Sequence, residues 1–412
     1  MAVRAPSRTA VVAYRHHLAN TGDGKFLAGK STTASGAGSG LTNGVYMVRS
    51  RDFGLSWEDP IEVFGARQAA GDLRSTVEVR KAAEEAETGA QNTAAENLET
   101  GGDRLLRSYS SPSLLCDLIT GRLFMMVAVN AKRVEVDGAP DVDEAVRLLV
   151  GISDDEGDNW GYSDITTYVN GSNDWQMHSA GPGHGIQMMS GTWTGRLIQP
   201  AVVDDVETTR AVTVCSDDRG LTWWTSQPVG ENITYASVAE MADGTLMMRT
   251  LDTVQERQTW WSYDAGRNWS SGTREEEIAY LDSPIHDIRC STKVERIFPC
   301  APVGTEHAST MLMVNRPVEG EHNVHAVVSL DDARTQYSEV EIMGDDSMSV
   351  HDMELLAMPD VRMAAMLVVK PEGLFAVHVD LDDLGLFNLA KGWNAHTEGQ
   401  EEVLRAFGFD PK

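Results

Sequence analysis

The chain has 412 residues, of which 42% are hydrophobic and 23% charged, which is enough for one or two folded domains and excludes disorder throughout. Its 62 acidic and 34 basic residues leave a formal charge of -28, which opposes broad contact with nucleic acid or anionic lipid. There is no apolar run of membrane-spanning length and no apolar leader at the start, so we expect a soluble protein, cytoplasmic rather than secreted.

A repeated motif, Ser-x-Asp-x-Gly-x-x-Trp, is the strongest pattern along the chain. Each copy follows a short β-forming run, so each is expected to be a hairpin corner whose Asp accepts backbone N–H bonds and whose Gly takes a positive φ. The Trp is expected to fold back and lie in the core. Intact copies occupy residues 50–57, 153–160, 216–223 and 262–269, and a worn copy without the Gly and Trp occupies 329–336.

The spacing of these copies is uneven, as expected for blades of four strands joined by loops of different lengths. It predicts an all-β chain folded as a radially repeated β-propeller. Residues 66–103 are rich in Ala, Glu and Thr without β alternation, so we interpret them as an insertion within the propeller, partly helical or mobile. Residues 385–412 are expected to form a short helical C-terminal tail that packs on the propeller.

The cysteines and histidines give no sign of a metal site. The four cysteines are far apart and form no Cys-x-x-Cys pair, which indicates buried free thiols. The histidines lack the spacing of a zinc site, and we expect no metal and no other cofactor.

Several segments beyond the motif resemble the sialidase (neuraminidase) family, in which the motif is called the Asp box. The segment 13–15 is similar to the family's opening Tyr-Arg-Ile-Pro strand, and 24–29 to its partner strand. Residues 181–187 resemble a Gly-Pro-Gly-His-Gly-Ile-Gln segment, and 238–244 a strand end. The resemblance implies a six-bladed propeller over residues 1–384 and an exo-acting glycosidase that removes a terminal sialic or related nonulosonic acid.

In that family three arginines hold the substrate carboxylate, and this chain matches them in part. Arg15 fits the first arginine, whereas Lys30 stands at the second and keeps the charge but not the planar fork. Arg249 lies two residues before another expected arginine, and His322 occupies a further arginine position. His184 and His16 are additional candidates for substrate binding, and Trp175 and Trp193 are candidates for stacking on a sugar.

The family's catalytic groups are a Tyr nucleophile, a Glu that activates it and an Asp acid/base. On this chain the Glu position falls on Tyr235, the Tyr position on His351, and the Asp position on a Gly/Ala/Ser stretch at 36–40. One interpretation makes Tyr235 the nucleophile and His351 its base, because a phenol must lose its proton before it attacks. The acid for the leaving group would then be one of four nearby residues, Glu354, Asp352, Asp287 or His286.

Two other functions are compatible with the same scaffold. In a propeller lyase, Arg15 and Lys30 would neutralise a uronate, and the Tyr235–His351 pair would cleave the glycan by β-elimination. Alternatively, the chain is a sialidase homologue that binds carbohydrate without catalysis. In each case the partner is an acidic carbohydrate or small glycoside, because the negative chain would repel a long acidic polymer.

Overall fold

The computed structural model describes the strands of the whole chain and many of the loops between residues 112 and 271. The described residues are 2–4, 9–17, 43–51, 56–64, 104–109, 112–134, 142–143, 146–180, 184–205, 207–254, 257–271, 293–296, 311–315, 323–329, 338–344, 349–354, 363–370 and 373–380. The segments 66–103 and 385–412, interpreted above as an insertion and a tail, lie outside them. No helix within these ranges is long and apolar enough to cross a membrane.

The described strands form six antiparallel sheets, and neighbouring strands in each sheet are mostly consecutive in the chain. Sheet A contains β1 (Ala2–Arg4), β2 (Thr9–His17), β3 (Asn43–Ser50) and β4 (Ile61–Phe64). Sheet B contains β5 (Arg104–Tyr109), β6 (Ser113–Asp117), β7 (Arg122–Val134), β8 (Val142–Asp143), β9 (Arg147–Ser153) and β10 (Gly161–Asp164). Sheet C contains β11 (Gln176–Ser179), β12 (Ile186–Gln187), β13 (Leu197–Asp204), β14 (Thr209–Ser216) and β15 (Trp224–Thr225).

The second half of the chain repeats this plan. Sheet D contains β16 (Ile233–Glu240), β17 (Leu246–Asp252), β18 (Arg257–Ser262) and β19 (Ser270–Ser271). Sheet E contains β20 (Lys293–Arg296), β21 (Met311–Asn315), β22 (Asn323–Ser329) and β23 (Ser338–Gly344). Sheet F contains β24 (Ser349–Glu354), β25 (Met363–Lys370) and β26 (Gly373–Asp380). A short helix, α3 (Thr166–Asn170), follows β10 of sheet B.

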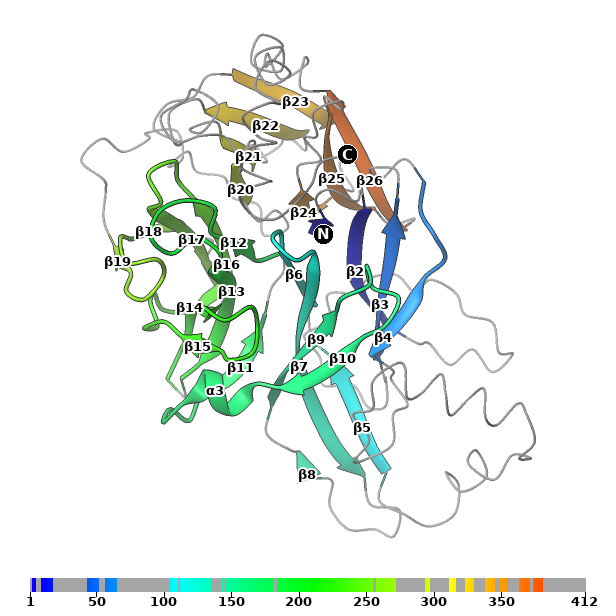
Figure 1. The fold of residues 1–412 in the computed structure, drawn as a ribbon, viewed down its shortest axis with the longest axis vertical. Helices are drawn as coiled ribbons and strands as arrows, with labels where there is room; N and C mark the ends of the chain where they lie inside the picture. The colour runs from blue at the N-terminus through cyan, green and yellow to red at the C-terminus, as the bar shows by residue number, and fades with distance from the viewer. Residues whose placement is uncertain are drawn as a thin grey trace.

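The sheets follow one another in chain order around the view of Figure 1. Neighbouring sheets touch through their inner strands: β6 contacts β12, β12 contacts β16, β16 contacts β20, and β20 contacts β24. Sheet A joins this series because β1 and β2 both contact β6. The result is a β-propeller-like, all-β fold in which each sheet contacts the next through a strand at or near its start in the chain.

The apolar core lies between the sheets, as β13 illustrates. Its side chains alternate, so Leu197 and Ala201 pack in a cluster shared with sheet B, whereas Ile198 and Val202 pack in a cluster shared with sheet D. A strand that is buried on both faces needs apolar residues at nearly every position, which explains the run LIQPAVVD.

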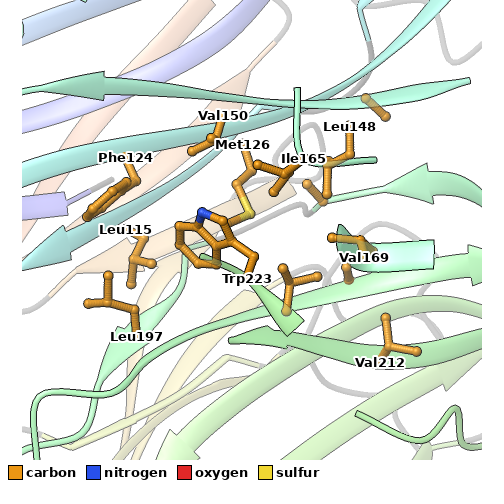
Figure 2. Close-up of a cluster of buried hydrophobic side chains, with 14 of the residues drawn as sticks. Leu115, Phe124, Met126, Leu148, Val150, Ile165, Val169, Leu197, Val212 and Trp223 are labelled. Atoms are coloured by element: carbon orange, nitrogen blue, oxygen red, sulfur yellow. The ribbon is translucent and has the colours of Figure 1, made fainter. Parts of the chain in front are cut away.

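The tryptophan of each described motif joins a sheet to the sheet before it. Figure 2 shows Trp223, which follows β14 of sheet C, among Leu115, Phe124 and Met126 of sheet B. The rings of Trp223 and Phe124 meet edge to face, with centroids 5.7 Å apart. Trp160 packs in the cluster of sheets A and B, and Trp269 in that of sheets C and D. The predicted core position is confirmed for these three, whereas Trp57 is only half-buried.

The motif's polar residues build the corner that the sequence predicted. In the copy at 216–223, the hydroxyl of Ser216 donates to Asp218 at 2.9 Å and accepts the N–H of Gly220 at 2.8 Å. Asp218 also accepts the N–H of Thr222 at 2.8 Å. Arg219 and Gly220 both have positive φ, at 58° and 82°. The glycine therefore occupies a backbone conformation that other residues rarely adopt.

Hydrogen bonds lower the pKa of the motif carboxylates. Burial by itself raises the pKa of Asp155, Asp218 and Asp264, but the bonds from backbone N–H groups and neighbouring side chains outweigh it and hold each pKa below its ordinary value. These carboxylates are therefore bound within their own turns, and the predicted structural role of the motif is confirmed.

Candidate functional site

The two ends of a sheet differ, and sheet D shows which end carries the candidate residues. Glu240 pairs with Leu246, and Leu246 pairs with Ser262, the first residue of the motif at 262–269. This is the motif end. Tyr235 pairs with Leu251 near the opposite end of the same strands. Tyr235 is therefore separated from the Asp boxes by most of the length of β16.

Tyr235 and Arg249 lie on the same face of sheet D. On β16, Ile233, Ala236 and Val238 pack against sheet C, so Tyr235 and Ser237 are on the other face. Arg249 pairs with Ser237, which places it diagonally next to Tyr235. The two side chains are 6% and 4% exposed, so a phenol and a cation are buried on one face.

A β-bulge determines where Tyr235 points. Ile233 pairs with Asp252 and Tyr235 with Leu251, so Thr234 is the extra residue. Because the bulge breaks the alternation, Ala236 returns to the sheet C side and Tyr235 is turned to the other. A second bulge lies near the start of β24, where Val350 pairs with Val368 and Asp352 with Leu367. His351 is the extra residue there, so both predicted catalytic positions lie at or beside a bulge.

The arginine expected after Gly244 is replaced by an apolar residue. Arg249 is two residues early, and the expected position is Leu251, which is 8% exposed and directly opposite Tyr235. The buried cation, Arg249, therefore lies diagonally across the strand pair from Tyr235, whereas Leu251 lies directly opposite it.

His184 lies where β6 and sheet C meet. It forms an isolated parallel bridge with Leu114, and the N–H of Gly185 donates to the carbonyl of Leu114 at 2.7 Å. A Cβ on Gly185 would come within 2.6 Å of the carbonyl oxygen of Ile198, so only glycine fits. The His184 side chain is half-buried.

The segment after His184 is held on both sides by buried polar groups. Gln187 donates to Asp117 at 2.7 Å, at the end of β6. Glu240 accepts the N–H groups of Met189 at 2.8 Å and Ser190 at 2.9 Å, at the end of β16. Strand β16 therefore carries Tyr235 near its start, and through Glu240 at its end it binds the segment that follows His184. The sequence reasoning missed Glu240 as an anchor.

For the remaining candidate residues, the structure either places the residue on a strand or does not describe it. Arg15 and His16 lie on β2, opposite Val45 and Gly44 of β3. In sheet A, β1 precedes β2, so Arg15 lies on the second strand of that sheet. Lys30 and His322 lie outside the described residues, as do Asp287 and His286. Asp352 and Glu354 lie on β24 with His351.

The two tryptophans predicted to stack on a sugar lie in different surroundings. Trp175 is partly buried against the core cluster between sheets B and C. Trp193 is at the motif end, with the guanidinium of Arg196 4.0 Å from its ring centroid. Among the described residues, no three His, Cys, Asp or Glu side chains gather as a metal site.

Comparison with known proteins identifies the family. The model described as "BNR repeat-like domain" matches residues 17–352. The chain belongs to this family. It is 27% identical over 238 residues to a sialidase of Micromonospora viridifaciens, which covers 56% of this chain and 36% of that protein. It is 29% identical over 168 residues to a sialidase of Bacteroides fragilis (strain YCH46), which covers 39% of this chain and 30% of that protein.

Solved structures agree at the level of the fold. The Hadza microbial sialidase Hz136 superposes with a TM-score of 0.62 at 18% identity, over 92% of this chain and 65% of that one. The intramolecular trans-sialidase from Ruminococcus gnavus, in complex with oseltamivir carboxylate, gives 0.60 at 16% identity, over 92% and 93%. The chain spans about a third of the length of its curated relatives. This BNR-family chain is a divergent sialidase-like protein, and the resemblance seen in the sequence is confirmed.

Proposed function

We propose that this BNR-family protein is an exo-acting glycosidase that removes a terminal acidic sugar, of the sialic or related nonulosonic class. The observation that carries the proposal is the burial of Tyr235 and Arg249 on one face of sheet D, far from the Asp boxes. Its sialidase relatives support the same class of reaction. The proposal includes a ring of six blades over residues 1–384, with residues 66–103 inserted and residues 385–412 packed on it.

The roles proposed for the site follow from the charge of the substrate. Arg249, Arg15 and Lys30 supply cations for the sugar carboxylate, and His16, His184 and His322 bind its polar groups. Tyr235 attacks the anomeric carbon after its hydroxyl proton passes to His351, because a neutral phenol is a weak nucleophile. The glycosidic bond breaks as its leaving oxygen takes a proton from a nearby acid, which is Glu354, Asp352, Asp287 or His286, and water then releases the sugar from Tyr235. Tyr235 and His351 are each the third residue of their strands, β16 and β24, and β20 contacts both strands.

Hydrolysis of a fluorogenic aryl sialoside tests the proposal. We expect fluorophore release by the unchanged protein and its loss in both Tyr235→Phe and His351→Ala. The exposed Tyr168, on α3, provides the matched control, and Tyr168→Phe should retain full activity. Release that persists in both site variants would overturn the assignment. An unsaturated product that absorbs in the near ultraviolet, formed from a uronate polymer, would replace hydrolysis by lyase chemistry.

A second candidate, carbohydrate binding without catalysis, is favoured by the apolar partner of Tyr235. Leu251 is buried directly opposite Tyr235, at the position where the family resemblance places an arginine. This function would give saturable binding of a sialylated oligosaccharide without turnover. Arg15→Ala should weaken that binding, and any release of sugar by the unchanged protein would exclude this candidate.

A further inference from the structure

A cluster of tryptophan and arginine side chains lies at the motif end of sheets C and D, away from Tyr235. It consists of Trp193, Arg196, Asp217, Trp224 and Arg267, and we refer to it as the Trp193 cluster. The Arg196 guanidinium carbon is 4.0 Å from the ring centroid of Trp193 and 4.9 Å from that of Trp224. That of Arg267 is 4.7 Å from the ring of Trp224 and 5.6 Å from that of Trp193.

The two arginines of the Trp193 cluster differ in what they bind. Arg196 is buried, donates to both oxygens of Asp217 at 2.6 and 3.1 Å, and donates to the carbonyl of Ala265 at 2.7 Å. Arg267 is half-exposed, and its nearest anionic atom among the described residues is an Asp217 oxygen 3.9 Å away. The Arg267 side chain makes no hydrogen bond within that part of the chain, so its planar set of donors faces solvent.

Charge and shape both favour an anionic ligand with an apolar face. Within the Trp193 cluster, two guanidinium groups face the single carboxylate of Asp217. Asp218 and Asp264, in the adjacent motifs, are bound within their own turns. The ring of Trp193 is 41% exposed, which leaves an aromatic surface beside the free donors of Arg267.

We propose that the Trp193 cluster is a second, non-catalytic binding site for a carboxylated sugar. The carboxylate would accept paired hydrogen bonds from Arg267, a geometry for which guanidinium is suited. The apolar face of the same pyranose would lie on the exposed part of Trp193. Arg196 contacts both tryptophan rings, Asp217 accepts a hydrogen bond from the Trp224 indole, and neither residue would contact the sugar. This site would retain the protein on an acidic glycan independently of turnover.

Calorimetric titration with free N-acetylneuraminic acid tests the site, because that monosaccharide has no glycosidic bond left to cleave. We expect Arg267→Ala and Trp193→Ala each to weaken binding at one site by about tenfold or more, as loss of a charge-assisted pair or a stacking surface does. Arg219→Ala is the matched control, since Arg219 is also an exposed motif arginine and lies outside the Trp193 cluster. It should bind as the unchanged protein does.

Two further measurements separate this proposal from the proposed glycosidase activity. Hydrolysis of the small aryl sialoside should be unchanged in Arg267→Ala. If no variant hydrolyses it but Arg267→Ala still weakens binding, the second site stands and the glycosidase activity fails. Unchanged binding in Arg267→Ala, or no binding by the unchanged protein, overturns the second site. Sulfate that binds as tightly as the sugar would also overturn it, since only a sugar uses Trp193.

Discussion

The Nη1 atom of Arg196 donates to the backbone carbonyl of Ala265, 2.7 Å away, although the two residues belong to adjacent sheets. Ala265 is the non-glycine residue with a positive φ in its Asp box, at 57°. The same relationship recurs between Arg122 and Arg219 at 3.4 Å, and between Arg49 and Glu156 at 3.0 Å. A guanidinium on one sheet thus binds the strained residue of the next box along the chain.

Arg196→Ala is expected to lower the free energy of unfolding by about 2–4 kcal/mol, because it removes a partly buried ion pair with Asp217 and leaves the buried carbonyl of Ala265 without its donor. Arg122→Ala should cost less, since Arg122 is more exposed and its carbonyl contact is longer. Thermal unfolding of both variants checks the order. A larger loss for Arg122→Ala would show that this contact does not govern stability.

Gly220→Ala is expected to disrupt the joint between sheets B and C. A Cβ there would lie 2.2 Å from Cε1 of Phe124, so the ring must move or the turn must open. Gly191→Ala is the control, because Gly191 also has a positive φ but nothing lies within 4 Å of its Cβ position. Gly191→Ala should cost only about 1–2 kcal/mol of backbone strain. Equal melting temperatures for the two variants would contradict this account.

Stability should fall in acid because of the Asp-box carboxylates. Their pKa values are lowered in the folded protein, so their contribution is complete above the unfolded pKa of about 3.9 and is lost as the pH falls through the folded values. Melting temperature measured between neutral pH and about pH 3 should therefore decrease most steeply below about pH 4. In Asp218→Asn the decrease should be shallower, and an unchanged pH profile would exclude Asp218 as a contributor.

Arg249→Lys is expected to reduce kcat/KM for the aryl sialoside by about 100-fold, because lysine keeps the charge but loses the paired donors of guanidinium. Arg210→Lys is a control, since Arg210 forms its ion pair with Asp205 at a partly exposed position of sheet C. Steady-state kinetics and the melting temperature should be measured together. Full activity in a folded Arg249→Lys protein would remove Arg249 from the site.

The features that the sequence predicted are those set by neighbouring residues. Ser, Asp and Gly of one motif bond to each other within a single turn, so the motif alone indicated the corner. The core positions of Trp160, Trp223 and Trp269 followed from the same short pattern. Such local contacts require no knowledge of which sheets are neighbours.

The features that the sequence did not reveal depend on pairing between distant segments. The bulges at Thr234 and His351 are defined only by the partner strand, and no residue type marks them. The hydrogen bonds from Arg196 to the Ala265 carbonyl and from the Ser190 N–H to the Glu240 carboxylate each join two sheets.

The placement of Trp160, Trp223 and Trp269 against preceding sheets has a consequence for fragments of this protein. A fragment that ends after sheet C would keep Thr213 and Cys215 but lose Trp269, which covers that side of the sheet. Its last sheet would then expose an apolar surface to water and favour aggregation. A fragment that is expected to fold independently must therefore include the tryptophan of the following hairpin. The smallest such fragment extends into the next sheet.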